Sequence, residues 1–130
     1  MASELRVDTL KDSSGNNSVG MSYVANGSAK AWNHYTQVSS VSITDSFNVS
    51  SISDITTGVT QTSFTTSMAN AAYIVSGSHN LPGGNSASIV SGYDNSGDFA
   101  TGTVSISTFN ASSGRVDCSK AQMAVNGELA

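Results

Sequence analysis

The amino-acid sequence predicts an all-β protein, in which a jelly-roll-like antiparallel β-sandwich follows an extended N-terminal arm. Of its 130 residues, 30 are the β-branched Val, Ile and Thr, whereas only 4 are Leu. β-Branched side chains lose rotamer freedom in a helix and pack well on a pleated sheet. Short stretches of alternating polar and apolar residues also recur, and clusters of Ser, Asn, Asp and Gly separate them about every 8–12 residues, as in sandwich folds.

Residues 1–30 form the predicted arm. Near its start, Leu5 and Val7 alternate with charged residues, which is the period-2 pattern of a half-buried strand. Residues 11–20 are mostly Asp, Ser, Asn and Gly and therefore form a turn or an extended connector. A second short β-like stretch at 19–24 runs into an Asn-Gly turn signal. We expect no helix in the chain.

Residues 31–130 form the predicted sandwich knob, with about seven or eight short strands. Asp45 falls on the apolar face of its strand, so we expect a bulge or a bend there. A Thr-Thr-Gly turn is expected at 56–58. The apolar residues that mark the expected strands are Val41, Ile43, Phe47, Val49, Ile52, Phe64, Tyr73, Val75, Ile89, Val90, Val104, Ile106, Val116, Met123 and Val125.

Charge and hydropathy argue against several functional classes. The formal net charge is −4 and the five basic residues are scattered, so we expect no nucleic-acid binding. No apolar run approaches the roughly 20 residues that span a bilayer, so we expect no membrane insertion. The first residues lack the pattern of a signal peptide. A single cysteine, Cys118, cannot form an internal disulfide, which favours synthesis in a reducing cytoplasm.

The residues that could carry chemistry form no catalytic motif. The chain has two histidines, His34 and His79, and lacks a Gly-x-Ser-x-Gly elbow, so we expect no enzyme activity. We expect His79 to be exposed at a strand end and Cys118 to be a small buried side chain. The acidic turn at 94–98 does not fit the calcium-loop template, and we expect no metal or other cofactor.

Carbohydrate binding is the strongest functional interpretation of individual residues. Lectin sites stack a sugar ring on an exposed aromatic side chain and bind its hydroxyls with polar groups. Tyr93 beside Asp94 and Asn95, and His79 beside Asn80, have this composition and lie near expected loops. The alternative is that Tyr93 covers the core at the end of its strand.

The arm gives the main prediction about partners. Leu5, Val7 and Leu10 are too few to bury one another, and a lone strand leaves a row of backbone hydrogen-bonding groups unpaired. A two-stranded piece is marginally stable in water. We therefore expect the arm to be either disordered or completed by another chain through strand addition.

Several strings in the first part of the chain resemble one family. They are Asn-Gly-Ser-Ala-Lys-Ala-Trp at 26–32, Asp-Ser-Phe-Asn-Val-Ser-Ser-Ile-Ser-Asp at 45–54, Phe-Thr-Thr-Ser-Met at 64–68 and Ala-Tyr at 72–73. In this order they resemble a domain of fibre-like virion proteins of marine tailed bacteriophages. The opening Leu-Arg-Val-Asp-Thr-Leu is similar to the shaft-joining segment of such fibres, although the chain is short for a tail fibre.

The resemblance implies a non-enzymatic virion structural protein made in the host cytoplasm. It implies a homotrimer, with the arm on a capsid, tail or fibre-base protein and the knob facing outward, where its distal loops are candidate contacts for a host glycan. We expect Trp32 and Tyr35 at the join between arm and knob, against a neighbouring subunit. Two alternatives stay open: a capsid decoration (head fibre) protein, and a free carbohydrate-binding module.

Overall fold

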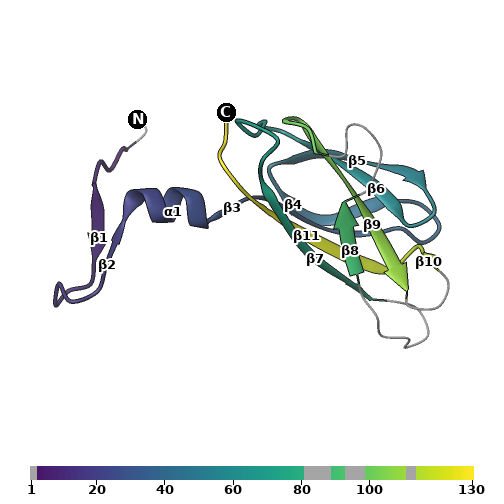
Figure 1. Cartoon of the computed structure of the whole chain (residues 1–130), viewed down its shortest axis with the longest axis horizontal. Helices are drawn as coiled ribbons and strands as arrows, with labels where there is room; N and C mark the ends of the chain where they lie inside the picture. Colours follow the sequence, from purple (N-terminus) through teal and green to yellow (C-terminus); the bar gives the residue numbers. More distant parts are fainter. Residues whose placement is uncertain (1–2, 81–88, 93–98, 111–113) are drawn as a thin grey trace.

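The molecule consists of an arm and a β-sandwich. The computed structural model describes residues 3–80, 89–92, 99–110 and 114–130. Figure 1 shows residues 3–28, the arm, projecting from one end of the sandwich, which contains the strands from Ala29 onward. The sandwich therefore begins slightly before the boundary that the sequence predicted.

The arm begins with a hairpin of two short strands. Strand β1 (Thr9–Lys11) pairs antiparallel with β2 (Ser18–Gly20), and Leu10 lies opposite Val19. These two strands form a sheet of their own. The polar stretch that follows β1 is thus a turn rather than an extended connector.

Asp12 organises this turn. Its carboxylate accepts hydrogen bonds from the side chain of Ser14 at 3.0 Å, from the amide of Asn16 at 3.0 Å and from the side chain of Asn17 at 2.6 Å. The hydrogen bonds from Asn17 and then Ser14 lower the pKa of this carboxyl, because they stabilise its charged form. The turn is held by short-range polar contacts on a fully exposed segment.

A short helix, α1 (Met21–Gly27), joins the hairpin to the sandwich. The β-like stretch expected at 19–24 is therefore a strand only at its first two residues, which belong to β2, and the expectation of no helix was wrong. Met21, Val24 and Ala25 have the i, i+3, i+4 spacing of a helical face, which the period-2 interpretation overlooked. The amide of Ser28 closes the helix by donating to the carbonyl of Val24 at 3.2 Å. No helix in the described ranges is long and apolar enough to cross a membrane.

The sandwich contains two antiparallel sheets, so the predicted all-β sandwich is confirmed (Figure 1). The β3 sheet has the strand order β4-β3-β11-β7. The β9 sheet has the order β10-β9-β6-β5, and β8 also pairs with β9. The strands are β3 (Ala29–Thr36), β4 (Ser42–Phe47), β5 (Val49–Thr56), β6 (Val59–Phe64), β7 (Ile74–Asn80), β8 (Ile89–Gly92), β9 (Thr103–Asn110), β10 (Gly114–Arg115) and β11 (Lys120–Asn126).

The first and last strands of the sandwich lie side by side in the middle of the β3 sheet. Strand β11 pairs with β3, so that Ala31 lies opposite Val125 and Tyr35 opposite Ala121. The other edge of β11 pairs with β7. The domain is therefore closed by contacts between segments that are far apart in the sequence, and both central strands have each edge paired.

Asn48 forms the corner at which the chain passes from β4 to β5 and so from one sheet to the other. Its backbone has a φ of 54°, a left-handed conformation that Asn tolerates better than most residues. Its side-chain amide donates to the carbonyls of Lys30 and Thr66, each at 3.0 Å. Its side-chain oxygen accepts from the amide of Thr66 at 2.7 Å. One side chain thus ties together three segments.

The turn predicted at 56–58 is confirmed as the connection between β5 and β6. Gly58 has a φ of 66°, and a Cβ at this position would lie 2.5 Å from the backbone nitrogen of Val116. A side chain is therefore excluded by both conformation and space. The amide of Gly58 donates to the carboxylate of Asp117 at 2.6 Å, which fixes the turn against the segment before β11.

The irregularity predicted at Asp45 is also confirmed. Tyr35 pairs with Ile43 and the adjacent His34 pairs with Asp45, so Thr44 is an extra residue in β4. This bulge reverses the alternation of β4 and places Asp45 on the outer face of the β3 sheet.

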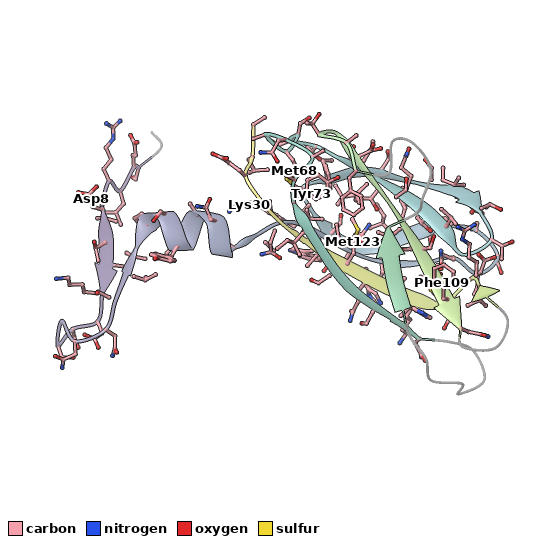
Figure 2. The ribbon with its side chains drawn as sticks, in the orientation of Figure 1. Asp8, Lys30, Met68, Tyr73, Phe109 and Met123 are labelled. Carbon is pink, nitrogen blue, oxygen red and sulfur yellow. The ribbon has the colours of Figure 1, made fainter. Side chains whose placement is uncertain are left out.

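The core lies between the two sheets. Figure 2 labels three of its members, Met68, Tyr73 and Met123. The Tyr73 hydroxyl donates to the carbonyls of Ala100 and Thr103 at 3.0 and 2.9 Å, which satisfies its polar end inside the domain. The buried members are Ala31, Tyr35, Phe64, Met68, Tyr73, Val104, Ile106, Cys118, Ala121, Met123 and Val125.

Two expectations about single side chains are corrected. Tyr35 is 1% exposed and belongs to the core, so it does not lie at the surface between arm and knob. It stands three positions from Trp32 on one strand, and such residues point to opposite faces. His79 is buried rather than exposed, because it points inward from β7 opposite the buried Ala121.

Candidate functional site

The arm presents apolar side chains to solvent. Leu5 and Tyr23 are 80% and 77% exposed, and Val7, Leu10 and Val19 are each more than one-third exposed. Three of these, Leu5, Val7 and Leu10, are the residues that the sequence singled out. Helix α1 also has no buried residue. Within a single chain, therefore, the arm's apolar groups have little cover.

The backbone of the arm also has hydrogen-bonding capacity to offer. A two-stranded sheet pairs each strand along one edge and leaves the other edge of each open. Strands β1 and β2 form such a sheet. An added strand from a second polypeptide would extend it and at the same time cover Leu10 and Val19, which pair with each other.

The arm is joined to the sandwich by a small set of polar contacts. The Lys30 ammonium donates to the carbonyl of Ala25 and to the hydroxyl of Ser28 at the C-terminal end of α1, where a cation is favourable. The side chain of Asn126 donates to the carbonyl of Gly27 at 3.2 Å. Figure 2 labels Lys30 at this junction, between the helix and the first strand of the sandwich.

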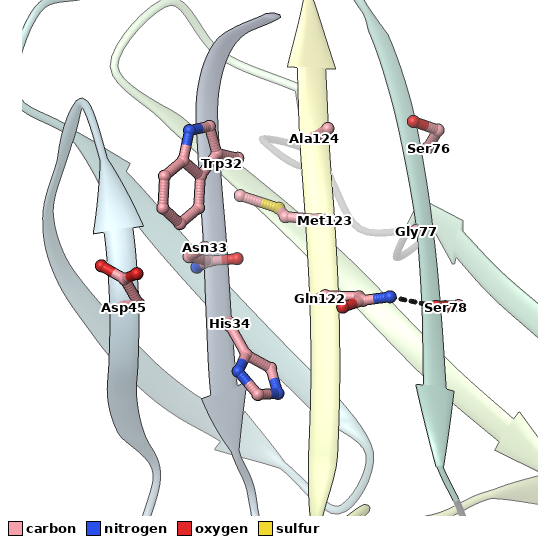
Figure 3. Close-up of a pocket in the computed structure, with 10 residues that line it drawn as sticks. All are labelled: Trp32, Asn33, His34, Asp45, Ser76, Gly77, Ser78, Gln122, Met123 and Ala124. Carbon is pink, nitrogen blue, oxygen red and sulfur yellow. Dashed lines mark hydrogen bonds between the residues drawn. The ribbon is translucent and has the colours of Figure 1, made fainter.

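A second candidate surface is a hollow of about 480 Å³ on the outer face of the β3 sheet. Figure 3 shows that all four strands of the sheet contribute to it. The lining residues are Trp32, Asn33, His34, Asp45, Ser76, Gly77, Ser78, Gln122, Met123 and Ala124.

Cross-strand register explains why the surface is hollow beside Trp32. One row across the sheet consists of Phe47, Trp32, Ala124 and Ser76, one residue from each strand. Two large aromatic side chains are thus followed by two small ones. The small side chains of Ala124 and Ser76 leave space next to the indole ring, which is 37% exposed.

The next row along the strands is polar. It consists of Asp45, His34, Gln122 and Ser78. The Gln122 amide donates to the Ser78 hydroxyl at 2.7 Å, the bond drawn in Figure 3. Asp45 accepts a hydrogen bond from the amide of Ser46 at 2.8 Å. These two hydrogen bonds fix the side chains of Gln122 and Asp45, which line the hollow.

A smaller hollow of about 200 Å³ continues the first. Its lining includes His34, Ser78 and Gln122, which also line the larger hollow, together with Asn80 and Lys120. The two hollows share these three residues and so form one groove, which we call the β3-sheet groove. It leads from Trp32 and Asp45 towards Asn80 and Lys120.

Two of the five residues predicted for glycan contact, His79 and Asn80, line the smaller hollow. Asn80 lies in the β3-sheet groove, whereas the buried His79 lines its floor. Tyr93, Asp94 and Asn95 lie outside the described residues.

Apart from His79 and Asn80, sequence reasoning missed the polar members of the groove, above all His34, Gln122 and Ser78. The spacing of Trp32 and His34 was a usable signal, since residues two apart on a strand share a face. Gln122 and Ser78 stand on strands that are far from β3 in the sequence. Their alignment with His34 depends on strand register, which has no signature in the sequence.

Cys118 is held in an unreactive form. It is fully buried, and its thiol donates to the side-chain oxygen of Gln37 at 2.8 Å. Burial raises its pKa to about 11, so the thiol is protonated at neutral pH and is a poor nucleophile. Among the described residues, no three His, Cys, Asp or Glu side chains are grouped as they would be in a metal site.

Comparison with protein-family models, with curated proteins and with solved structures finds no match to this chain. The arguments for function therefore come from the two surfaces described above. One is the exposed arm, and the other is the β3-sheet groove.

Proposed function

We propose that the protein is a non-enzymatic structural protein of a bacteriophage virion, a short trimeric fibre or knob anchored by its arm. The observation that carries the proposal is the exposed arm: residues 3–28 project from a closed sandwich with apolar side chains and strand edges open. The strings at 26–32 and 45–54, which resemble fibre-like virion proteins, support the same assignment.

The energetics of the arm favour assembly. Burying a Leu side chain that was exposed contributes about 1.5–3 kcal/mol. Leu5 and Tyr23 have most of their surface left to bury, and a partner strand would also pair the open edge of the hairpin. The ordering of the arm costs conformational entropy, and a hairpin that is already formed reduces that cost. The arm is therefore prepared to bind a second polypeptide.

The resemblance to fibre proteins supports a trimer, and the projecting arm supports assembly with another chain. Three arms could pair around a threefold axis, or each could dock on a capsid or tail protein, and both arrangements would satisfy the same edges. The sandwich would then lie outward, where it could contact the host surface. The protein would assemble in the host cytoplasm before it reaches the particle.

A capsid decoration protein is the second candidate. The observation that favours it is the direct connection between arm and sandwich: α1 ends at Gly27 and β3 begins at Ala29, so no shaft separates the two parts. In this arrangement the arm clips onto the shell and the sandwich covers it. Labelling of intact particles separates the candidates, since a fibre lies at few positions and a decoration protein at many positions over the head.

The arm hypothesis is tested by measuring native mass. The full chain is compared by light scattering with a chain that begins at Ser28 and with a full-length Leu5→Ser/Leu10→Ser variant. We expect three times the chain mass for the full protein and one chain mass for both variants. Circular dichroism controls for an intact sandwich. A full-length chain that remains monomeric at high concentration and binds no virion protein would refute the proposal.

A further inference from the structure

We propose that the β3-sheet groove binds a neutral linear oligosaccharide, with one sugar ring stacked on Trp32 and the next residues extending towards Asn80 and Lys120. This inference specifies the host contact in the proposed function, and it rests on the proposed function only for the identity of the host as the source of the sugar. The binding site itself depends on the sandwich alone.

The shape of the groove fits a ring beside an aromatic side chain. Trp32 stands on a central strand, and the neighbouring positions on β11 and β7 are Ala124 and Ser76. A flat ligand can therefore lie against the indole over a floor of small side chains. The C–H faces of a sugar ring are apolar, and an aromatic ring provides a matching apolar surface with little loss of side-chain entropy.

The chemistry of the groove fits hydroxyl groups. His34, Gln122 and Ser78 share its centre, and together they supply both donors and acceptors. A sugar hydroxyl can donate and accept in the same way. Asp45 accepts hydrogen bonds at one end, and the amide of Asn80 lies at the other. Polar groups arranged around an aromatic surface are the usual composition of a small-molecule site.

The charge distribution favours a neutral ligand. The groove has one carboxylate, from Asp45, at the Trp32 end and one ammonium, from Lys120, at the far end. Between them the shared residues are an imidazole, an amide and a hydroxyl. Such a surface has no cluster of like charges to attract a polyanion or a basic peptide.

The position of the groove argues against strand addition as its use. Strands β3 and β11 are both interior strands of the sheet, so their backbone edges are already paired. A ligand over them must be recognised by side chains. Those side chains stand on paired strands, which keeps the site largely preformed and lowers the cost of ordering it.

The length of the groove favours an oligosaccharide over a single sugar. The larger hollow adjoins Trp32, and the smaller one continues it past the shared residues to Lys120. The groove spans the four strands from β4 to β7, which is about 14 Å between the outer two strands at the usual strand spacing. A chain of two or three rings would occupy both hollows.

Trp32 is the single tryptophan of the chain, so its fluorescence reports on this site directly. The full-length protein is titrated with neutral oligomers of glucose, mannose, galactose and N-acetylglucosamine, after a glycan array has ranked these classes. We expect saturable binding of at least one class, with a shift in the Trp32 emission. Two- and three-ring oligomers should bind more tightly than the monosaccharide.

Three variants locate the site. Trp32→Ala should weaken binding about tenfold or more, measured by calorimetry, because the stacking surface is removed. Gln122→Ala should weaken it less. Phe47→Ala is the matched control: Phe47 is an exposed aromatic residue directly opposite Trp32 on the same face, but it does not line the groove. Its substitution should leave affinity unchanged.

Native mass distinguishes failure of this inference from failure of the virion proposal. Trp32→Ala should keep the oligomeric state of the parent protein. If no oligosaccharide binds at millimolar concentration, the inference is wrong, whatever the arm does. If Trp32→Ala and Phe47→Ala reduce the oligomer to a single chain without sugar, the face is a contact between copies and the inference is also overturned.

Discussion

The arm and the sandwich are stabilised by different kinds of contact. The sandwich is closed by contacts between distant segments, with β11 inserted between β3 and β7 and apolar side chains enclosed between two sheets. In the arm, apart from the bond from Asn126 to Gly27 at the junction, the hydrogen bonds run between residues close in sequence, and Leu5 and Tyr23 remain exposed. This difference indicates that the sandwich encloses its own core, whereas the order of the arm depends mainly on local hydrogen bonds.

Polar side chains also work differently in the two regions. In the sandwich, the Gln37 side chain accepts from the thiol of Cys118 and from the hydroxyl of Thr108, both far away in sequence. In the arm, Asp12 accepts from residues that lie within five positions of it. Buried long-range bonds strengthen a tertiary structure, whereas exposed short-range bonds compete with water.

The largest expected difference comes from removing an apolar side chain in each region. Ile106→Ala in the core should lower the free energy of unfolding by about 2–5 kcal/mol, because it leaves a cavity between the sheets. Leu5→Ala should change the free energy of unfolding of the isolated chain by no more than about 0.5 kcal/mol, since Leu5 is exposed.

Urea unfolding of the monomeric species measures both free energies. In the assembled protein, by contrast, Leu5→Ala should weaken the association between chains. A Leu5→Ala effect as large as that of Ile106→Ala in the monomer would mean that the arm folds against its own sandwich, and the comparison would fail.

A second, smaller difference is expected from the polar residue that organises a turn in each region. Asn48→Ala should destabilise the whole sandwich by about 1–3 kcal/mol, because it removes three hydrogen bonds and strains a left-handed backbone. Asn48→Gly keeps the backbone conformation and should cost less. Asp12→Ala should open only the hairpin.

Hydrogen exchange resolves the two cases residue by residue. Faster exchange confined to the amides of residues 12–20 is expected for Asp12→Ala, with the sandwich unchanged. Global unfolding caused by Asp12→Ala would contradict the separation of the two regions.

A third difference should appear as opposite responses of the two regions to pH. The folded-state pKa of Cys118 is raised to about 11 by burial, so the unfolded chain loses this proton first. Stability should therefore fall as the pH rises from about 9 towards 11, with a slope of up to about 1.4 kcal/mol per pH unit from this group. Burial raises the pKa of Tyr73 to about 12, in the same direction.

The arm should respond at the acid end. The pKa of Asp12 is lowered by its hydrogen bonds, so their contribution is present at neutral pH and is lost as the pH falls through this lowered value. Urea titrations between pH 7 and 10.5 measure the first effect, and Cys118→Ala should flatten the slope. Limited proteolysis of the arm at pH 7 and pH 3 measures the second. An alkaline slope that Cys118→Ala leaves unchanged would show that other groups cause it.

The sequence predicted the fold better than it predicted the site. Alternation of apolar and polar residues anticipated β4 and the bulge near Asp45, and the Thr-Thr-Gly composition anticipated the turn at Gly58, whereas β3 was not predicted as a strand. Alternation failed for α1, because a seven-residue segment with four apolar positions fits a strand as readily as about two turns of helix. It also failed for Tyr35, which was grouped with Trp32 by chemistry although an odd spacing on one strand places them on opposite faces.

Backbone preference and alternation are local properties, so the sequence by itself determined the β-rich character of the protein and its exposed apolar arm. Composition alone determined the net charge of −4. Tertiary structure alone decided that Gln122 and Ser78 would stand in line with His34, and that Ala124 would leave room beside Trp32. Strand register depends on the simultaneous packing of segments about ninety positions apart, and no short window of sequence contains that information.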